Sequence, residues 1–360
     1  MNSSYGLWKP QKSKLLLAVP ACILLMCMYY LYAVAGTEAN DRPLVSTWKY
    51  LSPREQASNS TLGFQKILAL SAGTSWRTRG LEAAARIAKI DVSVPTQPFI
   101  SDEIVKAFEL FGANDPNTKL PPHGSAKAWL AHLDLIKFVV ASGFETVLIV
   151  EDDVDWDVTI RDQMALLSDN VRTFQNTDHT DTTPYGSKWD VLWIGHCGEV
   201  TPTDIIKSEY RDESLVPTEL YAGWSKKYLT NIQEGYRVIQ KTKQTVCTFG
   251  YGISRVGAQN ILRQLSHGQN EAFDIALMTA CQQEHLRCIS VNPELMHHYN
   301  PKDGAGYVSS IAEANGQGQS FNEQAFELLR GTTANMKDSA RCAALFHDTC
   351  LQPPTRAEDY

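Results

Sequence analysis

The chain has 360 residues, of which 43% are hydrophobic and 20% are charged, and its formal net charge is −7. This length allows a membrane anchor with one large domain or two small ones, and the hydrophobic content is ordinary for a protein with a buried core. The acidic balance, without a long run of Lys and Arg, argues against nucleic-acid binding.

Leu15 to Ala35 form an uncharged, apolar run, and about 20 such residues suffice to cross a bilayer core. A cleaved signal peptide is the alternative, because Ala33-Val34-Ala35 fits a cleavage site. Lysines at 9, 12 and 14 precede the run, so the positive-inside rule places the N-terminus in the cytosol and the rest in the lumen. We therefore predict a single-pass type II protein of the Golgi or endoplasmic reticulum membrane.

The expected organisation has five parts. These are a cytosolic tail (1–14), a transmembrane signal-anchor helix (15–35), a polar stem (36–64), a lumenal globular domain (65–350) and a flexible tail (351–360). An oxidising lumen would pair the six cysteines beyond the apolar run, and sequence alone does not choose among the possible pairings. Our working pairs are Cys197–Cys247, Cys281–Cys288 and Cys342–Cys350. Asn59-Ser60-Thr61 is a candidate glycosylation site on the lumenal side.

Apolar strands and helices alternate through the domain. Strands are expected at Lys66–Leu70, Val147–Val150, Trp189–Ile194, Val246–Ser254 and Leu286–Val291. Helices are expected at Arg77–Lys89, Lys127–Ser142, Val256–Leu265 and Glu271–Gln282. Short apolar strands joined through helices predict an α/β fold with a mostly parallel sheet and helices on both faces. Ligands of such sheets bind beyond the carboxyl ends of the strands.

An acidic run follows the strand at 147–150 directly. Five carboxylates lie within seven residues, at Glu151, Asp152, Asp153, Asp155 and Asp157. These groups repel one another, and at the end of a buried strand they suit a divalent cation, which prefers hard oxygen ligands. An EF-hand loop is excluded, because the sixth and twelfth positions counted from Asp153 hold Val and Met instead of Gly and Glu. A solvated acidic loop is the remaining alternative.

The sequence around the acidic run resembles the core of glycosyltransferase family 25. That family includes bacterial lipooligosaccharide galactosyltransferases and animal collagen galactosyltransferases, and the general look here is that of fungal members. Residues 124–157 contain, in the family's order, a helix with His132, a turn at Gly143, an apolar strand and Glu-Asp-Asp at 151–153. Ala131 replaces the Ser that usually precedes the His. Looser similarities at 66–89, 189–195 and 248–262 extend the resemblance over about residues 66–300.

The resemblance implies a GT-A-like nucleotide-diphospho-sugar transferase fold with one divalent metal ion, Mn²⁺ favoured. It implies transfer of a hexose, galactose favoured over glucose, from a UDP-sugar to a glycan or glycoprotein acceptor, with inversion at the anomeric carbon. Asp153 and Asp155, a D-x-D pair, are then the leading metal ligands, and Asp152 is a further ligand or supports them. His298 is the candidate for a late His that completes the metal shell, and a simple surface pair with His297 is the alternative.

Three further residues are given expected roles. Arg77 and Arg79 follow the first strand and are candidates to bind uridine or diphosphate, with ordinary surface arginines as the alternative. Asp274 is the candidate general base, because the family carries a comparable acid after its Gly-Ala helix, and a helix cap is the alternative. For His132, on an apolar helix face, we favour a hydrogen-bonded structural role.

Two other functions compete with a transferase. One is a non-catalytic Golgi-resident protein that binds a nucleotide sugar or a partner; the retained Asp152, Asp153 and Asp155 argue against it. The other is a different lumenal metal enzyme, such as a phosphotransferase or hydrolase. The sequence has no P-loop, G-x-S-x-G or H-E-x-x-H motif to support that second alternative.

Overall fold

The computed structural model describes residues 51–111, 113, 118–301, 305–320, 323–331 and 334–348. Contacts divide the chain into two units, Met1–Leu51 and Ser52–Tyr360, and every described residue except Leu51 belongs to the second. The expected cytosolic tail, transmembrane helix and C-terminal tail lie outside the described residues. Among the helices that are described, none combines the length and apolar character needed to span a membrane.

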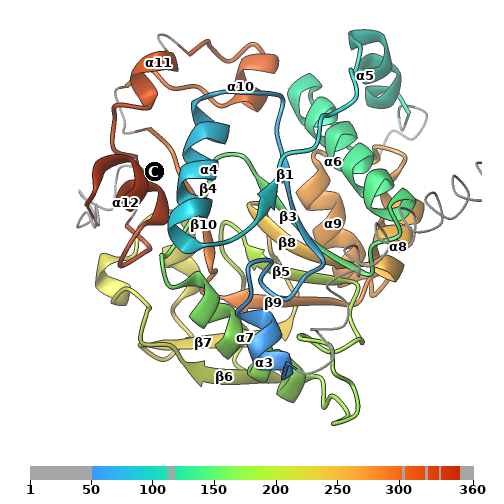
Figure 1. Cartoon of the computed structure of the whole chain (residues 1–360). Helices are drawn as coiled ribbons and strands as arrows, with labels where there is room; N and C mark the ends of the chain where they lie inside the picture. The colour runs from blue at the N-terminus through green and yellow to red at the C-terminus, as the bar shows by residue number, and fades with distance from the viewer. Residues whose placement is uncertain are drawn as a thin grey trace, which may run out of the picture. The chain divides into compact units, whose positions relative to one another are not determined.

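The described residues of the second unit form a ten-stranded sheet (Figure 1). Its strands are β1 (Lys66–Leu70), β2 (Val92–Ser93), β3 (Thr146–Glu151), β4 (Val154–Trp156), β5 (Val191–Gly195), β6 (Lys207–Arg211), β7 (Tyr236–Lys241), β8 (Gly250–Ser254), β9 (Cys288–Asn292) and β10 (Met296–His298). The main order is β2-β1-β3-β8-β5-β9-β7-β6, and β10 pairs with β4 and β5.

The sheet is mixed. Strand β1 runs parallel to β2 and β3, and β5 runs parallel to β9, but β8 lies antiparallel between β3 and β5. Strand β7 is antiparallel to both of its neighbours, β6 and β9. The expected fold class, a mostly parallel sheet of the GT-A type, is therefore wrong. The long connection from β5 to β8 contains the antiparallel pair β6–β7, and a connection of that kind does not impose the parallel return that a single crossover helix does.

Helices cover both faces of the sheet (Figure 1). They are α3 (Pro53–Ala57), α4 (Trp76–Ala88), α5 (Asp102–Glu109), α6 (His123–Ala141), α7 (Ile160–Phe174), α8 (Arg255–Leu265), α9 (Phe273–Gln282), α10 (Ser310–Ala314), α11 (Glu323–Phe326) and α12 (Ala340–Phe346). Side chains alternate along β3: Leu148 and Val150 pack in one core with α4 and α7, whereas Val147 and Ile149 pack in another with α6, α8 and α9.

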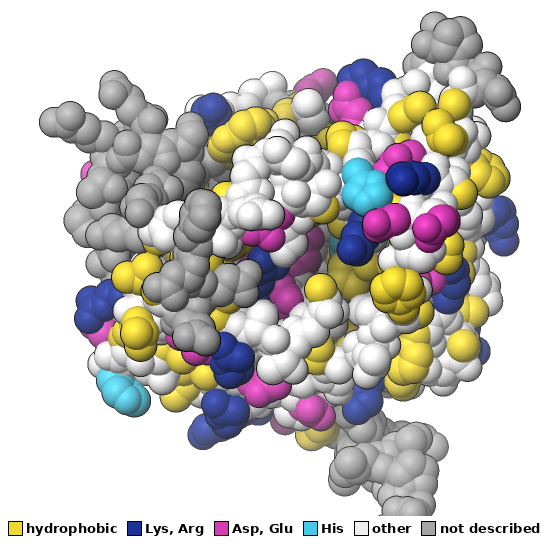
Figure 2. Space-filling view, turned by 90° about the horizontal axis from the view of Figure 1, so that it is seen from above, with side chains coloured by type: hydrophobic (Ala, Val, Ile, Leu, Met, Phe, Trp, Pro, Cys, Tyr) yellow, Lys and Arg dark blue, Asp and Glu magenta, His cyan; other side chains and the backbone are white. Residues whose placement is uncertain are grey.

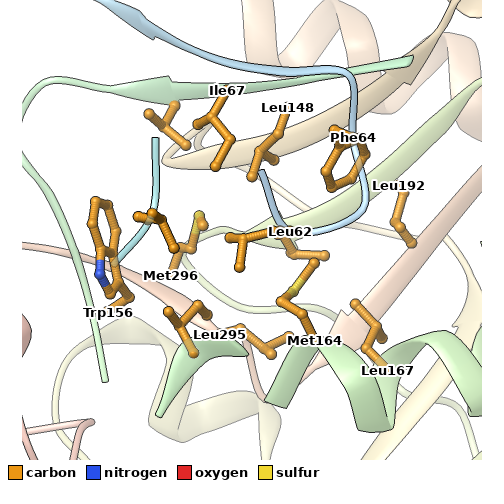
Figure 3. Packing of buried hydrophobic residues seen from close by; sticks show 14 of the residues in the cluster. Leu62, Phe64, Ile67, Leu148, Trp156, Met164, Leu167, Leu192, Leu295 and Met296 are labelled. Atoms are coloured by element: carbon orange, nitrogen blue, oxygen red, sulfur yellow. The ribbon is translucent and has the colours of Figure 1, made fainter. Parts of the chain in front are cut away.

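Residues 52–64, the last part of the stretch assigned to a stem, belong to the folded unit. Ser52 caps α3 through a capping box with Glu55. Leu62 and Phe64 are at most 1% exposed and lie in the first core beside Ile67 (Figure 3). The folded unit therefore begins before β1.

Several local expectations match the structure. Strand β1 has the expected bounds, and the pairs Cys197–Cys247 and Cys281–Cys288 are disulfide-bonded. The third expected pair includes Cys350, which lies outside the described residues. The strand expected from Val246 begins only at Gly250, since Cys247 has a left-handed backbone with φ of 67° that interrupts an extended run.

Two of the blocks that resemble the transferase family serve packing. Gly257 lies in α8 against the residue before β5, and a Cβ there would come within 2.1 Å of the Asp190 carbonyl oxygen. Ser254 accepts a hydrogen bond from the Gly257 N–H (3.0 Å) and so caps the helix. The Asp190 carboxylate binds Arg287 at 2.8 Å. These contacts hold α8 on the sheet.

Candidate functional site

The acidic run turns back on itself where β3 ends. Asp152 and Asp153 form the turn between β3 and β4, and β4 pairs antiparallel with β10. Because of this pairing, His298 lies opposite Val154, and the Tyr299 N–H donates to the Asp153 carbonyl oxygen (2.8 Å). The His298 Nε2 atom is then 3.2 Å from Asp153 Oδ2. The fold thus brings together two residues that the sequence proposed for one metal site.

Asp153 is buried and only partly satisfied. Its Oδ1 atom has no hydrogen-bond partner in the part of the chain that the structure describes. Burial acts to raise the pKa of Asp153, but the charge and hydrogen bond of His298, with Arg77 and Arg341, outweigh it and lower the pKa to about 2. A buried carboxylate oxygen without a partner is costly, so its presence at neutral pH marks a position for a cation or a donor group.

Asp152 connects the turn to the loop after β1. Its Oδ2 atom accepts a hydrogen bond from the Ser71 hydroxyl (2.6 Å), and its Oδ1 atom is 3.7 Å from Arg77 Nη1. Arg77, in the first turn of α4, also donates to Ser310 Oγ (2.7 Å). Burial and the neighbouring Asp153 charge raise the pKa of Asp152. The structure thus places Asp152 and Arg77 at the site.

Arg79 is placed elsewhere. Its Nε atom pairs with the Glu327 carboxylate, and about half of its side chain (49%) is exposed. This pair occupies the guanidinium at the surface, so the structure supports the surface alternative for Arg79 over the expected contact with a nucleotide.

Asp155 does not face Asp153. Its Oδ1 atom accepts hydrogen bonds from the N–H groups of Trp156 (2.8 Å) and Arg341 (3.0 Å), and its Oδ2 atom accepts one from the Ser339 hydroxyl. The residue is fully buried. Because both oxygens hold the start of α12, the structure gives Asp155 a structural role instead of the expected metal ligation.

Arg341, which no sequence pattern singles out, lies against the backbone of the turn. Its guanidinium donates to the carbonyl oxygens of Arg77 (3.0 Å), Asp152 (2.8 Å) and Val154 (3.0 Å). It is fully buried, and this burial lowers its pKa. Arg341 therefore fixes the backbone of the acidic turn and offsets part of its negative charge.

Tyr307 is a second residue that sequence reasoning missed. Its ring lies 5.9 Å from the Arg77 guanidinium. Burial, followed by the charge of Asp153, raises the pKa of Tyr307, so its hydroxyl stays protonated. Among the described residues this buried hydroxyl has no hydrogen-bond partner. The site therefore holds an unsatisfied donor as well as an unsatisfied acceptor.

Two more carboxylates lie behind the turn, and one short segment holds both. The Thr248 hydroxyl donates to Glu151 Oε1 (2.6 Å), and the Cys247 N–H donates to Asp274 Oδ2 (2.7 Å). Burial and the charge of Asp153 raise the pKa of Glu151 to about 7, and the charge of Asp274 adds to this rise. Asp274 also accepts from the N–H of Ile275 (2.9 Å) at the start of α9. It is thus both a local cap and a neighbour of the site.

His132 has the structural role that its helix face suggested. Its ring stacks on Phe273 with centroids 4.4 Å apart, and its nitrogens lie 2.9 Å from the Tyr251 hydroxyl and 3.4 Å from Thr248 Oγ1. Burial lowers the pKa of His132 to about 3. The neutral ring therefore supports Thr248, which in turn holds Glu151.

A pocket of about 210 Å³ opens beside His298. Seen from above the view of Figure 1, the surface is hollowed, and Asp/Glu and Lys/Arg side chains lie in the hollow (Figure 2). The described part of the chain contains no group of three or more His, Cys, Asp or Glu side chains arranged to hold a metal ion. Of the residues proposed as metal ligands, Asp153 and His298 have side chains in contact with each other.

Comparisons with known proteins add little to this geometry. No family model matches the chain, and no curated protein matches it. One similar solved structure is that of UDP-glucose pyrophosphorylase complexed with UDP-glucose. It covers 71% of this chain and 98% of its own, with 12% sequence identity and a TM-score of 0.31. A likeness at this level does not indicate an activity for this chain.

Proposed function

We propose that this protein is a metal-dependent glycosyltransferase similar to family 25, which transfers a hexose, galactose favoured, from a UDP-sugar to a glycan or glycoprotein acceptor. The observation that carries the proposal is the buried Oδ1 atom of Asp153, which has no partner among the described residues. The same carboxylate contacts His298, and the neighbouring Asp152 pairs with Arg77. The carboxylates of Asp152 and Asp153, the imidazole of His298 and the guanidinium of Arg77 therefore lie close together at the acidic turn.

The residues fit a small divalent cation such as Mn²⁺. Hard cations of this kind are commonly held by one or two carboxylates, with substrate phosphates and water supplying the other ligands. Asp153, with its unsatisfied oxygen, and His298 would hold the ion. When bound, such an ion stabilises the negative charge that develops on a departing diphosphate.

The chain's own groups supply the remaining functions. Arg77 presents a planar fork of donors suited to diphosphate oxygens. The Tyr307 hydroxyl is a further donor for the same ligand. We assign to Asp274, which the Cys247 N–H holds, the role of accepting the proton of an acceptor hydroxyl.

Cysteine usage supports a compartment for this activity. Cys197–Cys247 and Cys281–Cys288 are disulfide-bonded, and such bonds persist in oxidising compartments. We therefore include the lumen of the Golgi or endoplasmic reticulum in the proposal.

One observation favours a second candidate, a protein that binds a nucleotide sugar without turnover. Two hydrogen bonds tie Asp155 to the start of α12 and a third joins it to the Trp156 N–H, so the D-x-D pair contributes one metal ligand instead of two. A cation held by fewer protein groups suits reversible nucleotide binding as well as catalysis.

The test is a donor panel with the full-length protein. UDP-galactose, UDP-glucose and UDP-N-acetylglucosamine are incubated with Mn²⁺ or with EDTA, and released UDP is measured. Asp153→Asn is the test variant, and Asp162→Asn, at an exposed position of α7, is the matched control. Release of UDP from one donor that needs Mn²⁺ and is lost only in Asp153→Asn supports the transferase. Mn²⁺-dependent binding of UDP without release supports the second candidate, and absence of both contradicts the metal site.

A further inference from the structure

His298 connects the pocket to the acidic turn. His298 and Phe249 both line it, and their rings stack with centroids 5.0 Å apart and planes inclined by 14°. The Nε2 atom of the same His298 is 3.2 Å from Asp153. A molecule in the pocket would therefore lie one side chain away from the proposed metal ion.

The inner wall of the pocket carries a buried polar pair. Glu294 Oε1 lies 3.2 Å from His297 Nδ1, and the two side chains are 2% and 8% exposed. Both residues line the pocket. Buried polar groups in a pocket wall orient a ligand through its hydroxyl or amide groups.

The outer end carries an aromatic ring. Trp224 lines the pocket and is 57% exposed. The turn that carries it is fixed, because the side chain of Asn335 accepts from the Ala222 N–H (2.8 Å) and donates to the Ala222 carbonyl oxygen (3.1 Å). These bonds fix the backbone two residues before Trp224.

We infer that this pocket binds one neutral sugar ring of the acceptor glycan, an inference that rests on the proposed transferase function. An exposed aromatic face packs against the apolar C–H face of a pyranose, while its hydroxyls bond to fixed polar groups such as Glu294 and His297. The pocket volume of about 210 Å³ suits a single ring. The rest of the glycan would extend into solvent beyond Trp224.

The position of the pocket assigns it to the acceptor instead of the donor. The groups suited to a nucleotide diphosphate, Arg77 and the Ser71 loop, follow β1, whereas the pocket lies at β10 and after β5, across the Asp153–His298 pair. Cys197 lines the pocket and is disulfide-bonded to Cys247, whose N–H holds Asp274. The candidate base Asp274 is therefore connected to the pocket wall through one hydrogen bond and one disulfide.

Two rates measured on the full-length protein test this assignment. The first is UDP release from the donor sugar without acceptor, and the second is transfer to p-nitrophenyl glycosides of galactose, glucose, mannose and xylose. The variant is Trp224→Ala, with Trp224→Phe as the conservative replacement and Phe99→Ala, at a position 89% exposed outside the pocket, as the control. We expect Trp224→Ala to raise the KM for the preferred glycoside about tenfold, with donor hydrolysis unchanged and Trp224→Phe close to wild type. An equal loss of donor hydrolysis would place the donor in the pocket and overturn the inference.

A binding measurement separates failure of the pocket from failure of the transferase proposal. Saturation-transfer NMR with the same glycosides, in the presence of UDP and Mn²⁺, needs no turnover. A glycoside signal that is lost in Trp224→Ala and kept in Phe99→Ala supports the pocket even if no transfer is found. A signal that persists in Trp224→Ala, or no signal with the wild-type protein, overturns it.

Discussion

Two aspartates of one D-x-D pair, Asp153 and Asp155, have opposite environments. Asp153 has an unsatisfied oxygen beside His298, whereas Asp155 is bound to Ser339 and Arg341. The sequence pattern indicated that this run forms a site, but it could not separate the two residues. Ser339 and Arg341 are 184 and 186 residues away from Asp155 along the chain, so the sequence near Asp155 does not indicate these contacts.

These environments predict different consequences of substitution. Asp155→Ala leaves the Ser339 hydroxyl, the Arg341 N–H and the buried Arg341 charge without their partner, so we expect a loss of about 3–5 kcal/mol in the free energy of unfolding. Asp153→Asn keeps the size of the side chain and weakens its contact with His298, so we expect a smaller loss of about 1–3 kcal/mol. Urea unfolding of both variants measures the contrast, and equal midpoints would contradict it.

His132 predicts a pH dependence of stability. Its pKa is lowered to about 3 in the folded protein by burial, against about 6.5 in an unfolded chain. The unfolded state therefore binds more protons between these values, so stability from this residue is present above pH 6.5 and is lost as the pH falls toward 3, by about 1.4 kcal/mol per unit.

The test is His132→Phe, which keeps an aromatic ring against Phe273. The free energy of unfolding at pH 7, 6 and 5 should fall less steeply in this variant than in the wild-type protein. Parallel pH profiles for the two proteins would show that His132 does not carry this dependence.

At the scale of elements, sequence patterns located several strands but did not give their directions. Strand β1 was predicted with its bounds, since an apolar run between polar residues marks a buried strand. The antiparallel direction of β8 depends on the path taken by the chain from β5, which the apolar pattern of β8 does not record. Strands β4 and β10 have three residues each and exist through their pairing with one another, so periodicity could not reveal them.

The packing of α4 against α12 gives a prediction at this scale. A Cβ on Gly80 in α4 would come within 2.4 Å of the Arg341 Nη1 atom, whose guanidinium is held by three carbonyl oxygens. Helix propensity alone favours Gly80→Ala by about 1 kcal/mol, but overpacking costs about 1–3 kcal/mol. We expect overpacking to prevail, with a net loss of up to about 2 kcal/mol.

Thermal unfolding compares this variant with Glu82→Ala, at an exposed position of the same helix. The control should stay within about 0.5 kcal/mol of the wild-type protein. A Gly80→Ala variant that is more stable than the wild type would show that Arg341 is free to move, and would weaken its assigned role beneath the acidic turn.

At the scale of the whole molecule, the two described disulfides stabilise the fold unequally. Cys197–Cys247 spans 50 residues and Cys281–Cys288 spans 7. The chain-entropy relation gives about 4 kcal/mol for the longer loop and about 2.5 kcal/mol for the shorter one. Replacement of the Cys197–Cys247 pair by serines should therefore lower the urea midpoint more than replacement of the Cys281–Cys288 pair. The reverse order would mean that strain in the native state or residual structure in the denatured state, and not loop length, determines how much each disulfide stabilises the fold.

The site as a whole was predictable only in part. Residues that follow strands or begin helices in sequence, such as Asp153, His298 and Asp274, carried a positional signal. Arg341 and Tyr307 come from the C-terminal segment, which shows no apolar periodicity and reaches the acidic turn through tertiary packing alone. Buried polar groups of this kind are visible once the chain is folded, because their role depends on distant partners.

The proposed activity requires a nucleotide diphosphate site that depends on a divalent cation and on Asp153. Calorimetric titration of UDP into the full-length protein, with Mn²⁺ or with EDTA, tests it most directly. We predict that the wild-type protein and Asp162→Asn bind UDP when Mn²⁺ is present, and that EDTA or Asp153→Asn weakens binding about tenfold or more. Equal UDP affinity in all four measurements would contradict the central claim.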